Sequence, residues 1–212
     1  MKRTTFRMTG LAAAALTMSL GLAACGADEE PAADTGSEPT SEAPTEEEQT
    51  EEMGAQAQTY GEGCAQVPTD GDGSFEGMAT APVASAASAN PLLTTLVTAV
   101  GEAELVEPLN SAEALTVFAP ANPAFEAFSK KELNGLLKDK DTLTQVLTHH
   151  VVPEQISPDQ LSGEFETLNG DMITINGSGE EATIGDEEAA VLCGNIPTAN
   201  ATVYVIDTVL MP

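Results

Sequence analysis

The residues of this chain that are best suited to covalent or metal chemistry are three cysteines and an adjacent pair of histidines. The first cysteine, Cys25, ends the run LAAC, which follows a basic start at residues 2–7 and an apolar stretch that begins near Leu11. A basic start, an apolar run of roughly 7 to 15 residues and small residues before a cleavage point make up an export signal. The run is too short to cross a bilayer of about 30 Å as a helix. We therefore expect the chain to be exported.

The run LAAC followed by Gly26 resembles the bacterial lipobox. The resemblance implies that the Cys25 thiol carries a diacylglyceryl group and that cleavage before Cys25 removes residues 1–24 as a signal peptide. Each buried CH2 contributes about 0.8 kcal/mol to membrane binding, so two acyl chains give a stable anchor where one is marginal. A plain secretory signal with an incidental cysteine is the alternative.

The other two cysteines, Cys64 and Cys193, are far apart in the sequence. In an exported protein a pair of thiols is most simply a disulfide. Closing a loop of this length would stabilise the domain by roughly 4 to 5 kcal/mol in the chain-entropy model. The bond would tie residues 60–77 to the domain that follows. Two free thiols are the alternative, and the spacing lacks the Cys-x-x-Cys pattern of redox catalysts.

The histidine pair, His149 and His150, could suggest a metal site, but adjacent residues of a helix or strand point in different directions. The sequence around them lacks the His and Cys spacings of zinc sites, so we expect structural histidines and no metal. It also lacks the Gly-x-Ser-x-Gly elbow, a phosphate-binding loop and a dinucleotide fingerprint. We therefore expect no cofactor and no enzymatic activity.

The charge distribution excludes two classes of partner. The formal net charge is -27, and after residue 24 the only cations are four lysines, Lys130, Lys131, Lys138 and Lys140. Nucleic-acid binding depends on Lys and Arg that neutralise phosphates, so no nucleic acid is expected as a partner. The same shortage of cations argues against docking of the protein surface on anionic lipid.

The composition changes near residue 60, where we place a domain boundary. Residues 26–59 are rich in acidic residues, Pro, Ser, Thr and Ala, and they contain no Ile, Leu, Val or aromatic residue. Such a segment cannot bury enough apolar surface to offset its ordering entropy. The sequence therefore predicts a disordered acidic stalk over residues 25–59, with the lipidated Cys25 at its start. We expect residues 60–77 to form a segment that the disulfide attaches to the domain of residues 78–212.

Helical patterns come first in this domain and strand patterns follow. Helices are predicted to begin at Asn90, Asn122, Ser129 and one of Asp141 or Thr142. Strands are predicted at residues 115–118, 165–168, 172–176, 182–185, 189–192 and 201–210. This order favours an α+β domain with a largely antiparallel sheet.

Three segments resemble the signatures of the fasciclin domain, in the order and at about the spacing of that family. They are LTVFAPANPAF at residues 115–125, HHVV at residues 149–152 and NATVYVIDTVLMP at residues 200–212. The resemblance covers residues 78–212 and implies an antiparallel β-wedge or sandwich with a helical layer from its N-terminal half. The segments around Cys64 and Cys193 further resemble the surface-lipoprotein antigens of mycobacteria and related actinobacteria.

Each signature has a physical explanation. In the first, Phe118 and Phe125 bury aromatic area, Pro120 stops a strand and Asn122 begins a helix. In the last, nearly continuous apolarity around Tyr204 predicts a central strand. Asp207 interrupts that strand, and we expect a partly buried carboxylate that accepts structural hydrogen bonds.

The central signature of the family usually contains Tyr-His. Here His149 takes the place of the tyrosine and His150 that of the histidine. Because the resemblance associates this segment with adhesion in animal relatives, we treat both histidines as interaction candidates.

The resemblance implies a non-enzymatic, lipid-anchored protein on the outer face of the cytoplasmic membrane, with some release outside the cell. Its expected role is adhesion or another interaction with a host or matrix protein, as a monomer. The alternative is a binding module of the cell envelope for a small apolar or lipid ligand. A deep apolar cavity would favour that alternative, and a flat surface with an exposed apolar patch would favour adhesion.

Overall fold

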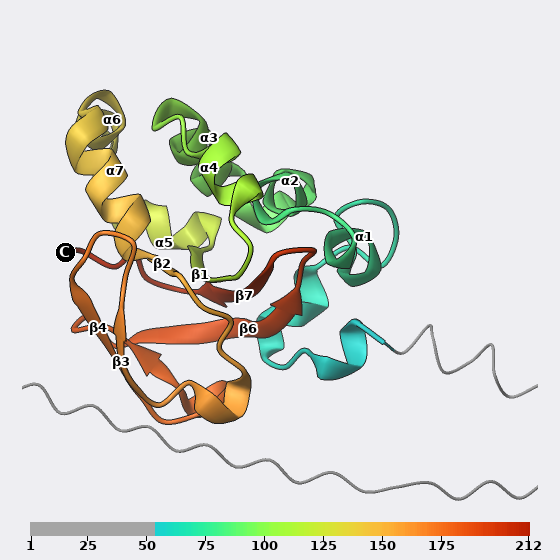
Figure 1. Ribbon diagram of the computed structural model, residues 1–212. Helices are drawn as coiled ribbons and strands as arrows, with labels where there is room; N and C mark the ends of the chain where they lie inside the picture. Colours follow the sequence, from blue (N-terminus) through green and yellow to red (C-terminus); the bar gives the residue numbers. More distant parts are fainter. Residues whose placement is uncertain (1–53) are drawn as a thin grey trace, which may run out of the picture. The chain divides into compact units, whose positions relative to one another are not determined.

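The computed structural model describes residues 54–212, in which helices pack against a seven-stranded sheet (Figure 1). The predicted signal peptide, Cys25 and the stalk up to residue 53 lie outside the described residues. Among residues 54–212, no single helix is long and apolar enough to cross a membrane. Only the bent pair Val83–Ala89 and Pro91–Glu102, at 99° to each other, passes by length and composition.

All α-helices of the described chain precede residue 150, and all its strands except the first follow them, as the predicted order of helices before strands requires. The α-helices are α1 (Phe75–Ala79), α2 (Val83–Ala89), α3 (Thr94–Glu102), α4 (Val106–Ser111), α5 (Asn122–Glu126), α6 (Lys130–Lys138) and α7 (Lys140–His149). The 3-10 helices are η1 (Gln56–Gln58), η2 (Glu62–Gln66), η3 (Pro91–Leu93), η4 (Pro158–Gln160) and η5 (Gly179–Glu181). The sequence did not predict α1, α2 and α4, which have only five to seven residues each.

Polar side chains start several of these helices. Asn90 caps η3 by accepting a hydrogen bond from the Leu92 N–H, and Ser129 forms the predicted capping box with Glu132 at the start of α6. The cap of α7 is Asp139, which accepts from the Thr142 N–H at 3.2 Å. The prediction of Asp141 or Thr142 as this cap was wrong, because the cap lies two or three residues earlier in the sequence.

Strand β1 lies between helices α4 and α5 in the sequence, and the other strands follow α7. The strands are β1 (Leu115–Pro120), β2 (Val151–Val152), β3 (Gly163–Glu166), β4 (Met172–Asn176), β5 (Thr183–Ile184), β6 (Ala189–Pro197) and β7 (Ala201–Ile206). Their order across the sheet is β2-β1-β7-β6-β5-β4-β3. Every pairing is antiparallel except that of β1 with β7, which is parallel. The domain is therefore α+β, as expected, with a mixed sheet.

The parallel pair β1–β7 lies at the centre of the domain and is buried on both faces. Val117 and Val203 face the helices, whereas Phe118 and Tyr204 face a second core that is closed by the other strands and loops. Phe118 pairs with Tyr204 in register, and their ring centroids are 5.8 Å apart. Because side chains alternate between the faces of a strand, two buried faces require nearly continuous apolarity. The prediction that the last strand is central is thus confirmed, although β7 ends at Ile206 and not at residue 210 as predicted.

The N-terminal part of the described chain lies along β6. Tyr60 and Gly194 exchange two backbone hydrogen bonds, of 3.3 and 2.8 Å, in an isolated antiparallel bridge. The Asn195 Nδ2 group also donates to the Gln58 carbonyl oxygen at 2.9 Å. Residues 56–58 form η1, so the structured part begins earlier than the predicted boundary at residue 60.

Candidate functional site

The two histidines lie where α7 ends, and their side chains take different directions. His149 is the last residue of α7 and His150 is its C-cap. The imidazole planes are nearly perpendicular, at 88°, and the ring centroids are 6.4 Å apart. Both residues are buried. The structure therefore corrects the assignment of His150 as an interaction candidate, because its ring is enclosed in the domain, whereas His149 lines the groove that is described below.

His150 joins α7 to the C-terminal segment. Its Nδ1 group donates to the Val146 carbonyl oxygen at 2.7 Å, and its Nε2 atom accepts from the Leu210 N–H at 2.9 Å. The first bond satisfies one of the carbonyl groups that a helix end leaves without a partner. Complete burial, helped by the neighbouring His149, lowers the pKa of His150 to about 4, although the bond to Val146 opposes the shift. His150 is thus a neutral, structural residue.

His149 instead contacts the turn between β3 and β4. Its Nδ1 atom lies 2.8 Å from Asp171 Oδ1. Asp171 also accepts hydrogen bonds from the Thr167 hydroxyl and from Asn169 Nδ2, the latter at 2.7 Å. Burial opposes ionisation of Asp171, but the hydrogen bonds from Thr167, Asn169 and His149 outweigh it and lower the pKa to about 2. An ionised Asp171 thus accepts from the Nδ1–H group of His149.

A groove of about 140 Å³ opens beside this pair, and we call it the C-terminal groove. His149 and Asp171 line one part of it, and Met172 follows on β4. Glu187, from the turn between β5 and β6, and Met211, near the C-terminus, line the other part. The Met211 N–H donates to Glu187 Oε1 at 3.1 Å, which holds the C-terminal segment against that turn.

Exposed apolar side chains lie in this groove and on the β3–β4 turn that contributes Asp171 to it. Met172 is 56% exposed, and Met211 and Leu168 are each 45% exposed. Leu168 belongs to the same β3–β4 turn as Asp171, because the Thr167 N–H donates to the Asp171 carbonyl oxygen at 2.8 Å. We call Leu168, Met172 and Met211 the apolar patch. Of the exposed large hydrophobic residues in the described chain, only Val106, on α4, lies outside it.

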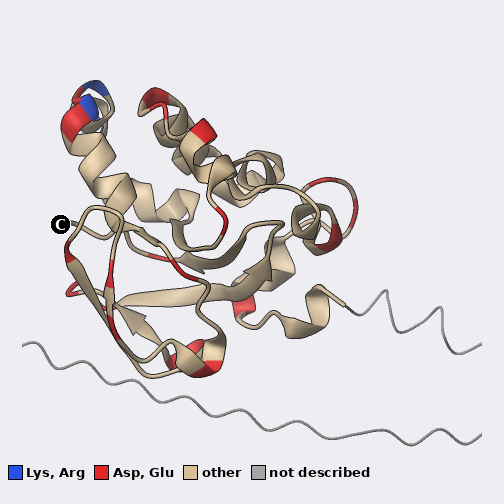
Figure 2. Ribbon diagram, in the orientation of Figure 1, with Lys and Arg blue, Asp and Glu red and all other residues tan. Residues whose placement is uncertain are grey.

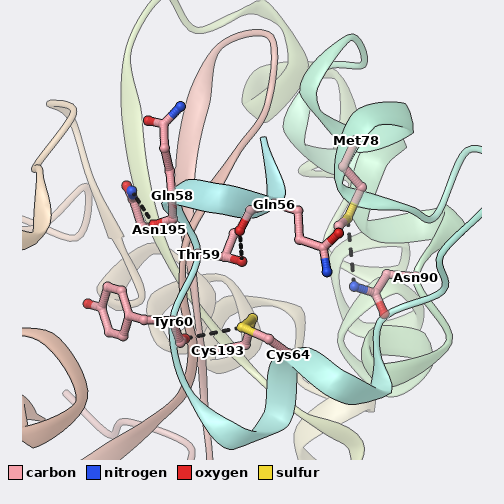
Figure 3. Close-up of a disulfide and its surroundings, with 9 residues drawn as sticks. All are labelled: Gln56, Gln58, Thr59, Tyr60, Cys64, Met78, Asn90, Cys193 and Asn195. Atoms are coloured by element: carbon pink, nitrogen blue, oxygen red, sulfur yellow. Dashed lines mark hydrogen bonds between the residues drawn. A yellow bond between two sulfur atoms is a disulfide. The ribbon is translucent and has the colours of Figure 1, made fainter. Parts of the chain in front are cut away.

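The predicted disulfide between Cys64 and Cys193 is present (Figure 3). It joins η2 to β6, and the two Cα atoms are 4.9 Å apart. The Tyr60 carbonyl oxygen lies 3.1 Å from the Cys64 sulfur. In Figure 3 the ring of Tyr60 points away from the disulfide, and a side chain at Gly194 would collide with that ring. The bond fastens η2 to β6, and with it the segment of residues 60–77 that was expected to be held by this disulfide.

The residues of the first signature have structural roles. Phe118 and Phe125 are buried, and Pro120 is the last residue of β1. Asn122 is the first residue of α5, but its side chain serves a different helix. Its Oδ1 atom accepts from the Thr95 N–H at 3.0 Å, and its Nδ2 group donates to the Pro91 carbonyl oxygen at 2.9 Å. Asn122 therefore caps the start of α3.

The last signature contributes one residue to the core and one hydrogen-bonding carboxylate to the surface. The Tyr204 hydroxyl donates to the Ile156 carbonyl oxygen at 2.8 Å inside the second core, and burial raises the pKa of this tyrosine. Asp207 is exposed, where partial burial was expected, because β7 ends at Ile206. Its Oδ1 atom accepts from the Ala190 N–H at 2.9 Å, which confirms that it makes structural hydrogen bonds.

Apolar space beneath the helices is small. A cavity of about 40 Å³ lies among α2, α3, α4, α7 and β1, and its lining includes Leu96, Leu109 and Phe118. Pockets that hold drug-sized ligands measure roughly 300 to 1,000 Å³. The cavity as it stands is therefore too small for a lipid chain.

The charges are strongly segregated in the described residues (Figure 2). All four lysines lie on α6 and at the first residue of α7, whereas acidic residues are spread over the rest of the surface. Lys140 makes an exposed ion pair with Glu104 at 2.8 Å. Among residues 54–212, no three His, Cys, Asp or Glu side chains are arranged to hold a metal ion together.

Sequence reasoning did not find Thr167, Asn169, Asp171 or the two methionines of the groove. The dipeptide Asn169-Gly170 signalled a turn, but not the residues that the turn would meet. Asp171 reaches His149 across 22 positions of the chain. A single sequence does not encode such a pairing in any local pattern.

The sequence model of the fasciclin domain family matches residues 91–212 of the chain. The cell surface glycolipoprotein MPB83 of Mycobacterium bovis is 39% identical over 200 residues, which cover 90% of this chain and 89% of the relative. The immunogenic protein MPB70 of Mycobacterium bovis is 44% identical over 167 residues, which cover 74% of this chain and 84% of the relative. The names of these two relatives describe a surface protein and an immunogenic protein, and neither describes an enzyme.

Among solved structures, the FAS1 domain pair of the insect cell adhesion molecule fasciclin I is similar to this chain, with a TM-score of 0.47 and 22% sequence identity. The match covers 55% of this chain and 44% of that one.

Proposed function

The chain belongs to the fasciclin family, and we propose that it is a non-enzymatic interaction protein displayed at the cell surface. This location is supported by the name of a relative, the cell surface glycolipoprotein MPB83. Lipid anchoring at Cys25 belongs to the same proposal, and its support is the lipobox-like sequence LAAC. On this proposal the domain is held outside the cytoplasmic membrane by a lipid and an acidic stalk, as a monomer.

The apolar patch is the observation that supports an interaction role best. Met172 and Met211 expose apolar area in a groove that carboxylates also line, and Leu168 exposes apolar area on the adjoining β3–β4 turn. Isolated exposed apolar residues are ordinary, but a cluster beside a groove is typical of interaction sites. The acidic surroundings favour a partner that carries lysine or arginine around an apolar side chain. The proposed partner is therefore an extracellular host or matrix protein with such a segment.

Binding of residues 26–212 to immobilised matrix proteins and to host cells at physiological salt tests this role. We expect saturable binding that weakens when the salt concentration rises. A triple variant, Leu168→Ser with Met172→Gln and Met211→Gln, should bind at least about tenfold more weakly, because the patch carries the apolar contacts. Val106→Ser is the matched control, since it removes an exposed apolar residue on α4. No saturable binding, or equal losses in both variants, would contradict the proposal.

The anchor has its own test. The full chain, expressed in a bacterium that processes lipoproteins, should partition into the detergent phase of a Triton X-114 extract. The Cys25→Ser variant should stay in the aqueous phase, and Cys64→Ser should behave as the unaltered chain does. Partition of Cys25→Ser into detergent would contradict a lipid at this residue.

A small apolar or lipid ligand is the second candidate. Its support is the apolar cavity beneath the helices, whose volume of about 40 Å³ would have to grow before an acyl chain could enter. Mass spectrometry of an organic extract from the purified domain tests this role. A stoichiometric lipid would favour it over adhesion, and a blank would count against it.

A further inference from the structure

One nitrogen of His149 is available in the C-terminal groove. Its Nδ1–H group donates to Asp171, which in turn is held by Thr167 and Asn169. This bond fixes the tautomer and leaves a lone pair on Nε2, which has no hydrogen-bond partner among residues 54–212. A carboxylate that orients a histidine in this way is the usual companion of a metal-bound imidazole.

Two thioethers line the same groove. Met172 lies on β4, where residues at alternate positions are buried, so its side chain is on the outer face of that strand. Met211 also lines the groove, and its N–H group donates to Glu187 Oε1. Both side chains are about half exposed, so core packing does not account for them. Their flexible, polarizable sulfur atoms are free to move toward a ligand.

From this arrangement we propose that the C-terminal groove binds one soft monovalent metal ion, Cu(I), through His149 Nε2 and the thioether sulfurs of Met172 and Met211. Soft thioether ligands select Cu(I), whereas Mg²⁺ and Ca²⁺ prefer sets of oxygen ligands. The groove, of about 140 Å³, is large enough for an ion and its ligands. Asp186 and Glu187 also line it, so the local charge favours entry of a cation.

A Cu(I) site in this groove contradicts the expectation from the sequence that the chain holds no metal. That expectation rested on the absence of a second histidine or cysteine at a ligand spacing, and it did not consider methionine. The two sulfur ligands come from positions 39 residues apart, on β4 and in the C-terminal segment, and neither lies near His149 in the sequence.

The test uses the full chain with Cys25→Ser in every sample, so that the free thiol does not compete for the metal. Cu(I) binding is measured without oxygen by competition with a chromophoric Cu(I) chelator, and the disulfide is kept oxidised. We expect one tight site per chain. Met172→Leu and Met211→Leu should each weaken it about tenfold or more, because leucine keeps the apolar volume and removes the sulfur.

Two controls separate the site from adventitious binding to methionine. Adding Val106→Met to the double leucine variant creates an exposed methionine on α4, and it should not restore binding. In a chain labelled at the methionine methyl carbons, Ag(I), a stable substitute for Cu(I), should shift the signals of Met172 and Met211 but not that of the buried Met78.

Three results with Cu(I) or Ag(I) would overturn the proposal. They are the absence of a tight Cu(I) site, unchanged affinity in both leucine variants, and Ag(I) shifts confined to other methionines. Tighter binding of Zn²⁺ that ignores the leucine substitutions would also overturn it, in favour of a site made of imidazole and carboxylate groups. Adhesion is tested separately, because the Met→Leu variants keep the apolar patch.

Discussion

The two ends of α7 are each joined to another part of the domain by a contact of 2.8 Å between charged or polar side chains. At the N-terminal end, Lys140 pairs with Glu104, and these side chains are 58% and 80% exposed. At the C-terminal end, His149 contacts Asp171, and these side chains are 8% and 33% exposed. Equal distances therefore occur in very different surroundings.

The surroundings decide what each contact contributes. Water screens an exposed pair, and holding two long side chains in one geometry costs entropy, so such pairs contribute little. At the buried end, His149 and the adjacent His150 contact two other segments, the β3–β4 turn and the C-terminal segment. We infer that α7 is fixed to the domain at its C-terminal end and only loosely at its N-terminal end.

The largest expected effect comes from His150. His150→Leu leaves the Val146 carbonyl and the Leu210 N–H group buried without their partner, so we expect a loss of about 2 to 4 kcal/mol. Urea unfolding at pH 7.5 measures it. Thr144→Ala, a substitution in the same helix away from its buried face, serves as the control. A loss below about 1 kcal/mol would mean that the C-terminal end is not the fixed one.

Acid should weaken the attachment of α7 to the domain at its C-terminal end. The pKa of His150 is about 4 in the folded protein, against 6.5 for an ordinary histidine. Between these values the unfolded chain binds a proton that the folded chain does not, so stability falls as the pH drops from 6.5 to about 4, by about 3 kcal/mol. Urea unfolding at intervals across this window checks the slope. His150→Leu should lose the slope, and a variant that kept it would show that another group is responsible.

Asp171 should affect the stability of the protein at lower pH than His150 does. Its pKa is about 2 in the folded protein, against 3.8 for an ordinary aspartate, so its contribution is present above pH 3.8 and is lost as the pH falls to about 2. Asp171→Asn weakens the bonds from His149, Thr167 and Asn169, and we expect a loss of roughly 1 to 2 kcal/mol at pH 7. Urea unfolding measures both effects. An unchanged acid slope in this variant would contradict the assignment.

The parts that the sequence predicted are those with a local pattern. Alternation predicted β4 at residues 172–176 correctly, and continuous apolarity predicted that β7 is central. The capping box at Ser129 was also correct. Helices α1, α2 and α4 were missed because segments of five to seven residues are too short to show a helical periodicity.

Contacts between distant segments could not be predicted in the same way. Asn200, a residue type that is common in turns, is buried and accepts from the Val83 N–H across 117 positions of the chain. It also donates to the Leu109 carbonyl oxygen across 91 positions. The His149–Asp171 contact belongs to this class, since folding alone brings its partners together. The C-terminal groove was unpredictable for the same reason.

The N-terminal end of α7 should depend on its cap more than on its ion pair. Asp139 accepts from the Thr142 N–H and from the Thr142 hydroxyl, at 3.2 and 3.0 Å. Removing an N-cap costs about 1 kcal/mol, so Asp139→Ala should lower stability by that amount. Thermal unfolding measures it, and Asp139→Asn, which keeps the capping oxygen, should be nearly neutral. An equal loss in both variants would assign the effect to charge.

The smallest effect is expected for the exposed pair itself. The bond to Lys140 lowers the pKa of Glu104 and the bond to Glu104 raises that of Lys140, but both groups are fully solvated. Lys140→Ala, Glu104→Ala and the double variant should therefore unfold at the temperature of the unaltered protein, at both low and high salt. A coupling between the two residues that disappears in salt would show that α7 is held at both ends, and the contrast between its ends would then fail.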